Sequence, residues 1–341
     1  MLLRFVFTFV CLWGLSGFAG GQQHYRIVSY NVENLFDIQD APDTRDEDFT
    51  PFGRLHWNRE KYTDKLLKLA EALKAAGEGE FPVFIGLCEV ENRRVLKDLT
   101  QKTGLAEGGY GIVHRDSPDA RGIDVAFLYR KALFRVIDEE FLPIPFSPEE
   151  EVYTRDILYV SGVLEQDTLH FMVCHFPSMS GGEAESEWKR KRAAAVVKEK
   201  VGKLQSENSE AAIVIMGDLN GRADRPAQTV VLGTKDSGAV PIQSGDLYNT
   251  GYYLLKRGYG SYKYKGTWQT IDHIIVSGAL LNGSHVLQTD PRLQVFNPRF
   301  LLEEDKIYYG LKPFRTYLGP RYHGGYSDHL PVYLDLKRRN K

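Results

Sequence analysis

Short apolar runs recur along the chain, and many of them end abruptly in residues that can do chemistry. Such runs, bounded by turn residues, are typical of strands buried in a sheet. Charged groups are costly to bury alone, but at strand ends they can converge at one sheet edge, where α/β folds commonly keep their sites. The polar residues at these ends include Asn31, Glu89, His175, Asp218, Asn220, Asp272 and His329. Turn chemistry explains any one ending, whereas their repetition on separate strands predicts a single shared site.

The same pattern predicts how strands and helices alternate. Two pairs of adjacent strands are expected, 123–129 with 133–137 and 157–164 with 168–174. No internal repeat or low-complexity linker divides the chain, so a single domain over 24–338 is the simplest organisation. Apolar residues at helical spacing predict helices over 61–76, 90–99 and 185–204.

The N-terminus has the pattern of a secretory signal peptide over residues 1–19. A short positive segment ends at Arg4, an apolar run follows over 5–15, and small residues follow at 17–19. The run is too short to span a bilayer comfortably. We therefore expect a secreted or periplasmic protein, with an uncleaved anchor or a buried N-terminal strand as the alternatives.

Charge and cysteine content narrow the classes of function. The formal net charge of −2 gives no global basic field, which disfavours a tight sequence-reading DNA-binding protein. A nuclease is compatible with this charge because its phosphate contacts can be local. Cys88 and Cys174 lie in apolar runs, so we expect two free buried thiols, with a disulfide as the alternative in an exported protein.

The polar residues at the strand ends fit metal-assisted hydrolysis. Asn, Asp and Glu oxygens suit a hard cation such as Mg²⁺, and nearby histidines can transfer protons or bind phosphate. Such a set can hydrolyse a phosphoester without a covalent intermediate. The chain lacks a GxSxG elbow, a Walker A loop and an HExxH helix, which excludes the enzyme classes that depend on them.

Two long segments, 246–268 and 297–326, combine cations with tyrosines. Cations and aromatic rings together suit phosphates and stacked bases. The alternative is that each segment is a solvated surface loop packed on itself.

Four motifs carry a resemblance to a known family. They are Ser29-Tyr30-Asn31-Val32-Glu33-Asn34-Leu35-Phe36, Gly86-Leu87-Cys88-Glu89-Val90-Glu91-Asn92, Gly217-Asp218-Leu219-Asn220 and Ser327-Asp328-His329. In this order they resemble the motifs of the endonuclease/exonuclease/phosphatase superfamily, which includes DNase I, and the opening motif resembles that of predicted extracellular bacterial nucleases. The resemblance implies a four-layered α/β sandwich, in which two mostly antiparallel sheets pack face to face with helices outside.

The resemblance also implies roles in metal binding and catalysis. Glu89 would hold a divalent cation, helped by Asn31 and Asp328; Mg²⁺ is expected, with Mn²⁺ or Ca²⁺ as alternatives. The remaining roles concern the reacting groups. Asp218 would orient or deprotonate the attacking water, Asn220 would fix the phosphate, and His329, oriented by Asp272, would be a catalytic imidazole.

His175 would contact a phosphate oxygen, with Asp124 as its carboxylate partner. Arg121 is expected either to clamp the phosphate or to form a surface salt bridge. The sequence departs from the family pattern at Cys174, where many relatives have Asn, and at His273, which we expect to be structural. Glu33 and Glu91 lie beside motif residues and are expected to point away from the site.

Three functions remain open from the sequence. The first is an exported phosphodiesterase acting on nucleic acid, a monomer without a stable protein partner. The second is a phosphatase or phospholipase-type enzyme acting on inositol phosphates, sugar phosphates or sphingomyelin, because specificity resides in loops grafted on the fold. The third is a binding module with the same fold that has lost activity.

Overall fold

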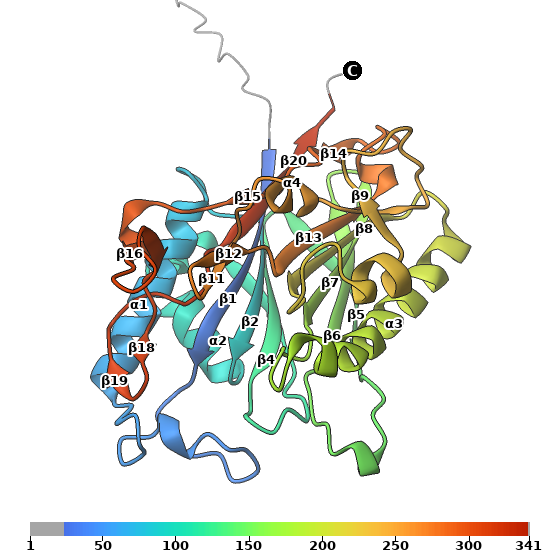
Figure 1. Ribbon diagram of the computed structural model, residues 1–341. Coiled ribbons are helices and arrows are strands. Elements are labelled where there is room, and N and C mark those ends of the chain that lie inside the picture. Colours follow the sequence, from blue (N-terminus) through green and yellow to red (C-terminus); the bar gives the residue numbers. More distant parts are fainter. Residues whose placement is uncertain (1–23, 340–341) are drawn as a thin grey trace, which may run out of the picture.

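The computed structural model describes residues 24–339, and the predicted signal peptide lies outside them. Two seven-stranded sheets pack face to face, with helices on their outer faces (Figure 1). The first sheet has the order β14 (Leu287–Thr289), β20 (Val332–Arg338), β1 (His24–Leu35), β2 (Phe84–Val90), β4 (Asp124–Arg130), β3 (Tyr110–Val113), with β15 (Gln294–Val295) also beside β20. The second has the order β5 (Phe134–Leu142), β6 (Ile157–Leu164), β7 (Asp167–His175), β8 (Ala212–Asp218), β13 (Asp272–Ser277), β10 (Leu247–Asn249), β9 (Thr234–Asp236).

Helices form the outer layers, and three small hairpins lie outside the two large sheets. The first sheet is covered by α1 (Arg59–Ala76) and α2 (Arg93–Gln101), and the second by α3 (Glu183–Glu207) (Figure 1). The remaining elements are the short α4 (Tyr252–Leu255), a π-helical turn at Ala227–Leu232, and three hairpins, β11 (Tyr262–Tyr264) with β12 (Thr267–Gln269), β16 (Leu302–Glu304) with β17 (Leu311–Pro313), and β18 (Tyr317–Leu318) with β19 (Arg321–Tyr322). Short 3-10 turns lie at Glu47–Phe49, Ala106–Gly108, Pro148–Glu150, Gly278–Leu280 and Arg299–Leu301.

This architecture confirms the predicted four-layered sandwich. Most strand pairs are antiparallel, and the parallel ones in the described sheets are β1 with β2, β7 with β8 and β9 with β10. The pairing of 157–164 with 168–174 is confirmed as β6 with β7.

The predicted pairing of 123–129 with 133–137 is wrong. The first segment is β4, which pairs with β2 and β3, and the second is β5, which pairs with β6 in the other sheet. The chain crosses between the sheets here because Phe134 inserts its ring into the core between them, 4.9 Å from the ring of Phe84 and 5.9 Å from that of Phe171. A short connection in sequence therefore joins two layers instead of forming a hairpin.

Apolar side chains from both sheets hold the sandwich together. Ile27 and Phe84 of the first sheet and Phe171 and Val214 of the second are fully buried in one cluster. Each fully buried side chain of this kind contributes roughly 1.5–3 kcal/mol relative to an exposed one. Face-to-face packing of the two sheets therefore contributes substantially to stability, and it fixes how strand ends from different sheets meet.

Strand register places the polar ends side by side. Because β7 and β8 are parallel, His175 and Asp218 are register partners at the ends of their strands. Asp272, the first residue of antiparallel β13, is the partner of Asp218 on its other side. On the first sheet, Asn31 pairs with Cys88, and a bulge follows in which Glu89 has a φ of +66°. Bulges commonly re-aim a side chain next to an active site.

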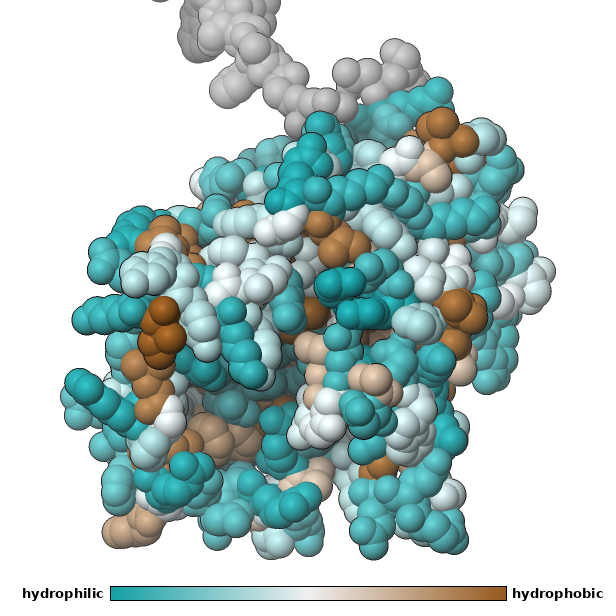
Figure 2. Space-filling view, in the orientation of Figure 1, coloured by the Kyte–Doolittle hydropathy of each residue, from teal (hydrophilic) through white to brown (hydrophobic). Residues whose placement is uncertain are grey.

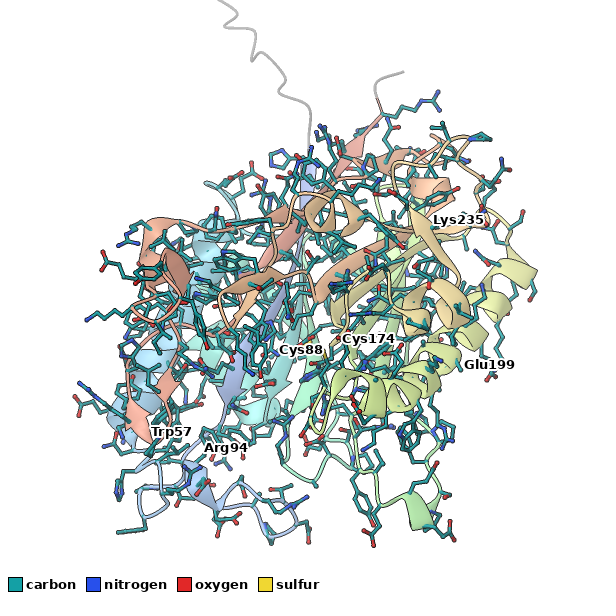
Figure 3. The ribbon with its side chains drawn as sticks, viewed as in Figure 1. Trp57, Cys88, Arg94, Cys174, Glu199 and Lys235 are labelled. Carbon is teal, nitrogen blue, oxygen red and sulfur yellow. The ribbon has the colours of Figure 1, made fainter. Side chains whose placement is uncertain are left out.

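Cys88 and Cys174 are free and buried, as expected, and they lie near the centre of the sandwich (Figure 3). The Cys88 thiol donates a hydrogen bond to the backbone carbonyl of Cys174 at 3.4 Å. The two residues therefore join β2 to β7 across the space between the sheets.

Within residues 24–339, no helix combines the length and apolar character needed to cross a membrane.

Gly217 tests how strongly the site depends on backbone packing. Its φ is +137°, and a Cβ placed there would lie 1.8 Å from the carbonyl oxygen of Cys174 on β7. We expect Gly217→Ala to lower the free energy of unfolding by about 3 kcal/mol, because strained backbone and a clash with a rigid strand both contribute. Denaturant unfolding followed by circular dichroism measures this change.

Gly202→Ala is the matched control. Gly202 lies on α3, and a Cβ placed there would have no neighbour within 4 Å. This substitution should raise stability by about 0.5–1 kcal/mol, because alanine is the better helix former. Equal changes in the free energy of unfolding at the two glycines would show that the clash at Gly217 does not destabilise the fold.

Candidate active site

The strand ends of both sheets open into one cleft of about 610 Å³. The face of the molecule seen in Figure 2 is mostly hydrophilic, with scattered hydrophobic residues. The predicted site residues that line the cleft are Asn31, Glu89, Arg121, His175, Asp218, Asn220, Asp328 and His329. Face-to-face packing of the sheets thus brings together residues that lie almost 300 positions apart, since Asn31 and His329 both face Asp218.

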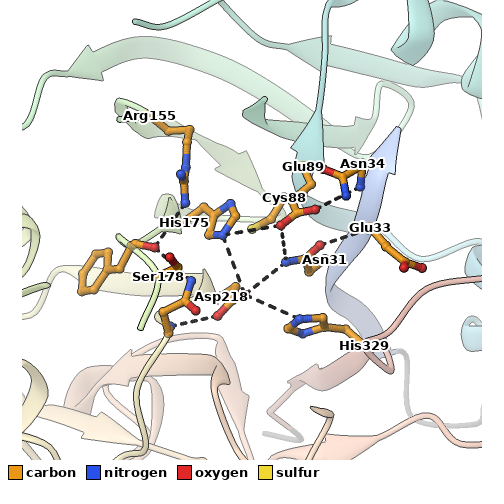
Figure 4. A network of polar contacts seen from close by, with 12 residues as sticks. Asn31, Glu33, Asn34, Cys88, Glu89, Arg155, His175, Ser178, Asp218 and His329 are labelled. Atoms are coloured by element: carbon orange, nitrogen blue, oxygen red, sulfur yellow. Dashed lines mark hydrogen bonds and ion pairs between the residues drawn. The ribbon is translucent and has the colours of Figure 1, made fainter. Parts of the chain in front are cut away.

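Asp218 lies at the centre of this group and is 2% exposed. Its Oδ2 lies 3.8 Å from Nε2 of His175 and 3.8 Å from Nε2 of His329, and it accepts a hydrogen bond from Nδ2 of Asn31 at 3.1 Å (Figure 4). Its Oδ1 accepts from the backbone N–H of Asn220 at 2.8 Å. Burial, followed by the nearby Asp272 carboxylate, raises the pKa of Asp218 above its ordinary value. A carboxylate in this environment is suited to accept a proton.

His329 is held by a carboxylate. Its Nδ1 lies 2.7 Å from Oδ2 of Asp272, which also accepts a hydrogen bond from the hydroxyl of Ser261. Burial by itself would lower the pKa of His329, but the Asp272 and Asp218 carboxylates outweigh it and hold that pKa well above its ordinary value. The ring of Tyr262 packs against the imidazole, with centroids 4.8 Å apart. This arrangement fixes the ring through Asp272, the contact that the family resemblance implied, and directs Nε2 towards Asp218.

His175 lacks the carboxylate partner that the sequence predicted. Its buried Nδ1 has no hydrogen-bond partner among residues 24–339. Nε2 faces Asp218 and lies 4.0 Å from Oε1 of Glu89. Burial, followed by the guanidinium groups of Arg155 and Arg121, lowers the pKa of His175 well below its ordinary value. A neutral imidazole can contact a phosphate oxygen only through a ring N–H.

Asp124 is engaged elsewhere, so its predicted pairing with His175 is wrong. Oδ1 of Asp124 accepts hydrogen bonds from the backbone N–H and the hydroxyl of Ser117, and Oδ2 faces His114. Asp124 is the first residue of β4, and the bulge in β2 pairs it with Val90, one residue past Glu89. The bulge thereby separates Asp124 from the cleft, an effect that sequence spacing does not reveal.

The predicted metal ligands, which carry oxygen atoms, come from parts of the chain that are far apart in sequence. Glu89 accepts a hydrogen bond from the backbone N–H of Asn34 at 3.0 Å, and the Asn31 amide lies 3.4 Å from Glu89 and ties it to Asp218 (Figure 4). Asp328 lines the same cleft and accepts from Arg315 at 3.0 Å. Two carboxylates and an amide fit a hard divalent cation, which prefers oxygen ligands. Their role as ligands remains a prediction.

The Asn220 side chain is fixed by a hydrogen bond, whereas the Arg121 side chain is held less tightly. The Asn220 amide donates to the backbone carbonyl of Phe176 at 3.0 Å, which fixes its side chain at the base of the cleft. The Arg121 guanidinium is half exposed and lies 3.8 Å from Asp119, whose other oxygen is held by buried Arg155 at 2.9 Å. Arg121 therefore remains available to an anion in the cleft.

A second hollow of about 390 Å³ adjoins the cleft and shares Arg121 with it. Arg45, Arg54 and Arg315 also line this hollow, together with Asp48, which pairs with Arg54, and Glu33, which pairs with Arg315. The backbone N–H of Arg45 donates to Ala120 at 2.9 Å, so the segment after β1 lies against the segment that carries Arg121. The hollow is suited to bind an anionic group next to the one in the cleft.

Sequence reasoning missed several residues that support the site. Arg315 lies in the segment 297–326 and bridges Glu33 and Asp328, while Tyr262 lies in the segment 246–268; both segments were singled out by their cations and tyrosines. Arg155 and Ser261 gave no signal, because neither lies in a motif. Arg155 contacts Asp119 and the Phe176 carbonyl, and Ser261 contacts Asp272, only in the folded chain. His273 is structural, as expected: it is fully buried and bonded to Gly221 and Asn249.

Comparison with known proteins places this site in context. The family model described as Endonuclease/Exonuclease/phosphatase family matches residues 26–338. A similar solved structure is a mannosyl-6-phosphatase of Bacteroides thetaiotaomicron, with 16% identity, a TM-score of 0.56, and 92% of this chain and 99% of that chain covered. Another is TDP2 of D. rerio complexed with a single-strand DNA product, with 16% identity, a TM-score of 0.56, and 92% and 98% covered. At these identities the likeness shows the shared fold. Among curated proteins no match was found.

The Asp272 carboxylate should control the pKa of His329. Asp272→Asn keeps the shape of the side chain but removes the carboxylate that raises the pKa of His329, so that pKa should fall. Proton NMR of the metal-free protein measures this pKa, and the His329→Gln spectrum assigns the signal. Asp167→Asn is the control, because Asp167 contacts His285 at 3.2 Å at the opposite end of β7. An unchanged His329 pKa in Asp272→Asn would show that the pair does not set it.

Proposed function

Because the chain belongs to the Endonuclease/Exonuclease/phosphatase family and is a metal-dependent phosphoester hydrolase, we propose that it is a phosphodiesterase whose substrate is nucleic acid. The observation that carries the proposal is the buried Asp218 carboxylate with an imidazole 3.8 Å away on each side, at the base of a cleft lined by further oxygen donors. The signal-peptide pattern supports action outside the cell or in the periplasm.

The side chains of the cleft have separate roles in hydrolysis. Asp218 accepts a proton from the attacking water, and its raised pKa brings its basicity closer to neutral pH. His329, held by Asp272, stabilises negative charge through the proton on Nε2. His175 and Asn220 contact the phosphoryl oxygens, and Arg121 neutralises charge at the mouth of the cleft.

Glu89, Asn31 and Asp328 are the residues that would hold a divalent cation, and Mg²⁺ suits this oxygen set best. When bound, the cation polarises a phosphoryl oxygen and neutralises developing charge. Arg315 limits the negative charge near this set, because it is shared between Glu33 at 3.2 Å and Asp328 at 3.0 Å.

The hollow beside the cleft favours a substrate with more than one phosphate. Arg45 and Arg121 lie on adjoining segments, and among the described residues Arg45 has no ion-pair partner. Tyr262 and Tyr264 line the cleft itself and offer rings against which a base can stack. The similar TDP2 structure holds a single-strand DNA product, which supports the same substrate class.

A phosphatase acting on a sugar phosphate is the second candidate. The similar mannosyl-6-phosphatase structure favours it, because the same fold then serves monoester hydrolysis. A lone sugar phosphate leaves the adjoining arginine-lined hollow without a ligand, which is why the diester is preferred. The presence of the complete set of carboxylates and imidazoles argues against a binding module without activity.

A substrate panel tests the proposal. With Mg²⁺ or Mn²⁺, we expect the purified protein to cleave plasmid DNA or RNA and bis-p-nitrophenyl phosphate, and chelation to stop the reaction. Turnover of p-nitrophenyl phosphate alone would instead establish the phosphatase, and no turnover of any substrate would establish the inactive module.

Two variants connect this activity to the site. Glu89→Gln and His329→Ala should each lower kcat by about 10³-fold or more, since each removes a group that acts in the transition state. Their thermal melting temperatures should stay close to that of the parent protein, and Glu60→Gln on the exposed start of α1 is the control. A large loss of stability in both variants would mark these residues as structural.

The arginine-lined hollow makes a separate prediction. Arg45→Ala should lower kcat/KM for an oligonucleotide by about 10-fold or more, because a hydrogen bond to a charged group contributes about 1.5–3 kcal/mol. Hydrolysis of bis-p-nitrophenyl phosphate, which carries one phosphate, should be unchanged. Arg257→Ala is the matched control, since Arg257 packs over the ring of Tyr253 instead. Equal losses on both substrates would refute a second phosphate subsite.

A further inference from the structure

Asp124 belongs to a second polar cluster that the proposed reaction does not use. The cluster consists of His114, directly after β3, Asp116 in the loop that follows, and Asp124 at the start of β4. A ligand atom from each of the three lies within 4.8 Å of the others. The His114 side chain is 1% exposed and that of Asp124 is 3% exposed, whereas Asp116 is 76% exposed.

The buried imidazole of His114 is unpartnered in a way that points to a ligand. Its Nε2 is buried and has no hydrogen-bond partner in the described part of the chain. It faces Oδ2 of Asp124 at 3.9 Å, which is too long for a hydrogen bond. Leaving a buried ring nitrogen without a partner costs about 1–3 kcal/mol. A cation between the two atoms would remove that cost and would require the pair to close only slightly.

The rest of the cluster is arranged as a coordination shell would be. Ser117 donates to Oδ1 of Asp124 through both its backbone N–H and its hydroxyl, which orients the carboxylate and leaves Oδ2 towards His114. Outer hydrogen bonds of this kind orient metal ligands. Asp116 Oδ1 lies 3.8 Å from Nδ1 of His114, the ring nitrogen that does not face Asp124, so the exposed Asp116 side chain has to turn towards Nε2 to provide a third ligand.

We propose that His114, Asp116 and Asp124 bind a second divalent cation, separate from the one in the cleft, and that this cation is of the zinc type. One imidazole nitrogen with two carboxylate oxygens suits Zn²⁺, which binds three protein ligands and a water in open sites. A hard ion such as Mg²⁺ favours all-oxygen sets. The exposed Asp116 side places the water ligand towards solvent.

The site has a structural consequence for the cleft. The loop between His114 and Asp124 carries Asp119, which binds Arg155, and Arg121, which lines the cleft. A cation that ties both ends of this loop together would restrict its motion and hold Arg121 in place. The proposed role is therefore to order the loop, and the cation takes no part in the reaction.

Calorimetric titration of the chelator-treated full chain with Zn²⁺ tests the site. The titration is done in the parent protein and in Glu89→Gln, because the cleft can also bind Zn²⁺. In both backgrounds, His114→Gln should remove one Zn²⁺ site or weaken it by about 100-fold or more, since even outer hydrogen bonds contribute about 10–100-fold. The visible spectrum of bound Co²⁺ should lose intensity in the same variant.

Two further variants keep the test decisive. Asp116→Asn should weaken the same site by about 10-fold or more, and because Asp116 is 76% exposed it decides the question even where His114→Gln fails to fold. His24→Gln, at an exposed histidine at the start of β1, is the matched control and should leave the titration unchanged. Zn²⁺ binding that is the same in the parent, His114→Gln and Asp116→Asn proteins would overturn the proposal. Loss of the site in Asp116→Asn would support it.

Discussion

The candidate active site depends on the burial of one carboxylate, Asp218, between groups that come from both sheets. A buried carboxylate is costly unless polar neighbours surround it. His175 comes from β7 of the second sheet, whereas Asn31 comes from β1 of the first, and His329 lies shortly before β20 of the first. His175 is the register partner of Asp218 within the second sheet, but Asn31 and His329 do not reach Asp218 unless the two sheets pack face to face. Packing of the apolar core between the sheets therefore assembles the polar site at their edge.

Behind the cleft, a second buried network holds the long segment 297–326 in place. The Lys65 side chain, fully buried on α1, donates to the Thr316 hydroxyl and to the Tyr326 carbonyl, both at 2.6 Å. Glu33 accepts from the backbone N–H of Thr316 at 2.6 Å. These contacts anchor a segment with little regular structure to α1 and to β1 of the first sheet. They explain how Asp328, directly after this segment, is presented to the cleft.

The two sides of the cleft differ in what holds their side chains in place. Asp218, Asp272 and His175 lie on adjacent strands and are fixed by register. Arg121 and Arg45 lie on loops that touch through one backbone hydrogen bond, from Arg45 to Ala120. Reacting groups on strands and specificity groups on loops are the usual division in enzymes, because loops can change without disturbing the core. The same division explains why the fold alone does not select between a diester and a monoester substrate.

By itself the amino-acid sequence determined the family, because its motifs are short local patterns, and the family resemblance implied the sandwich fold and most of the residues that meet in the cleft. Apolar runs predict strands, and short motifs such as Gly217-Asp218-Leu219-Asn220 and Ser327-Asp328-His329 stand directly at strand ends. The tertiary structure alone decided that 123–129 and 133–137 do not pair, and which histidine faces Asp124. Segments 124–130 and 134–142 are adjacent in sequence but belong to different sheets, and a bulge beside Glu89 turns Asp124 away from His175 towards His114. Pairing across sheets is set by packing between distant segments, and a bulge shifts side chains by one position; neither leaves a periodic signal in the sequence.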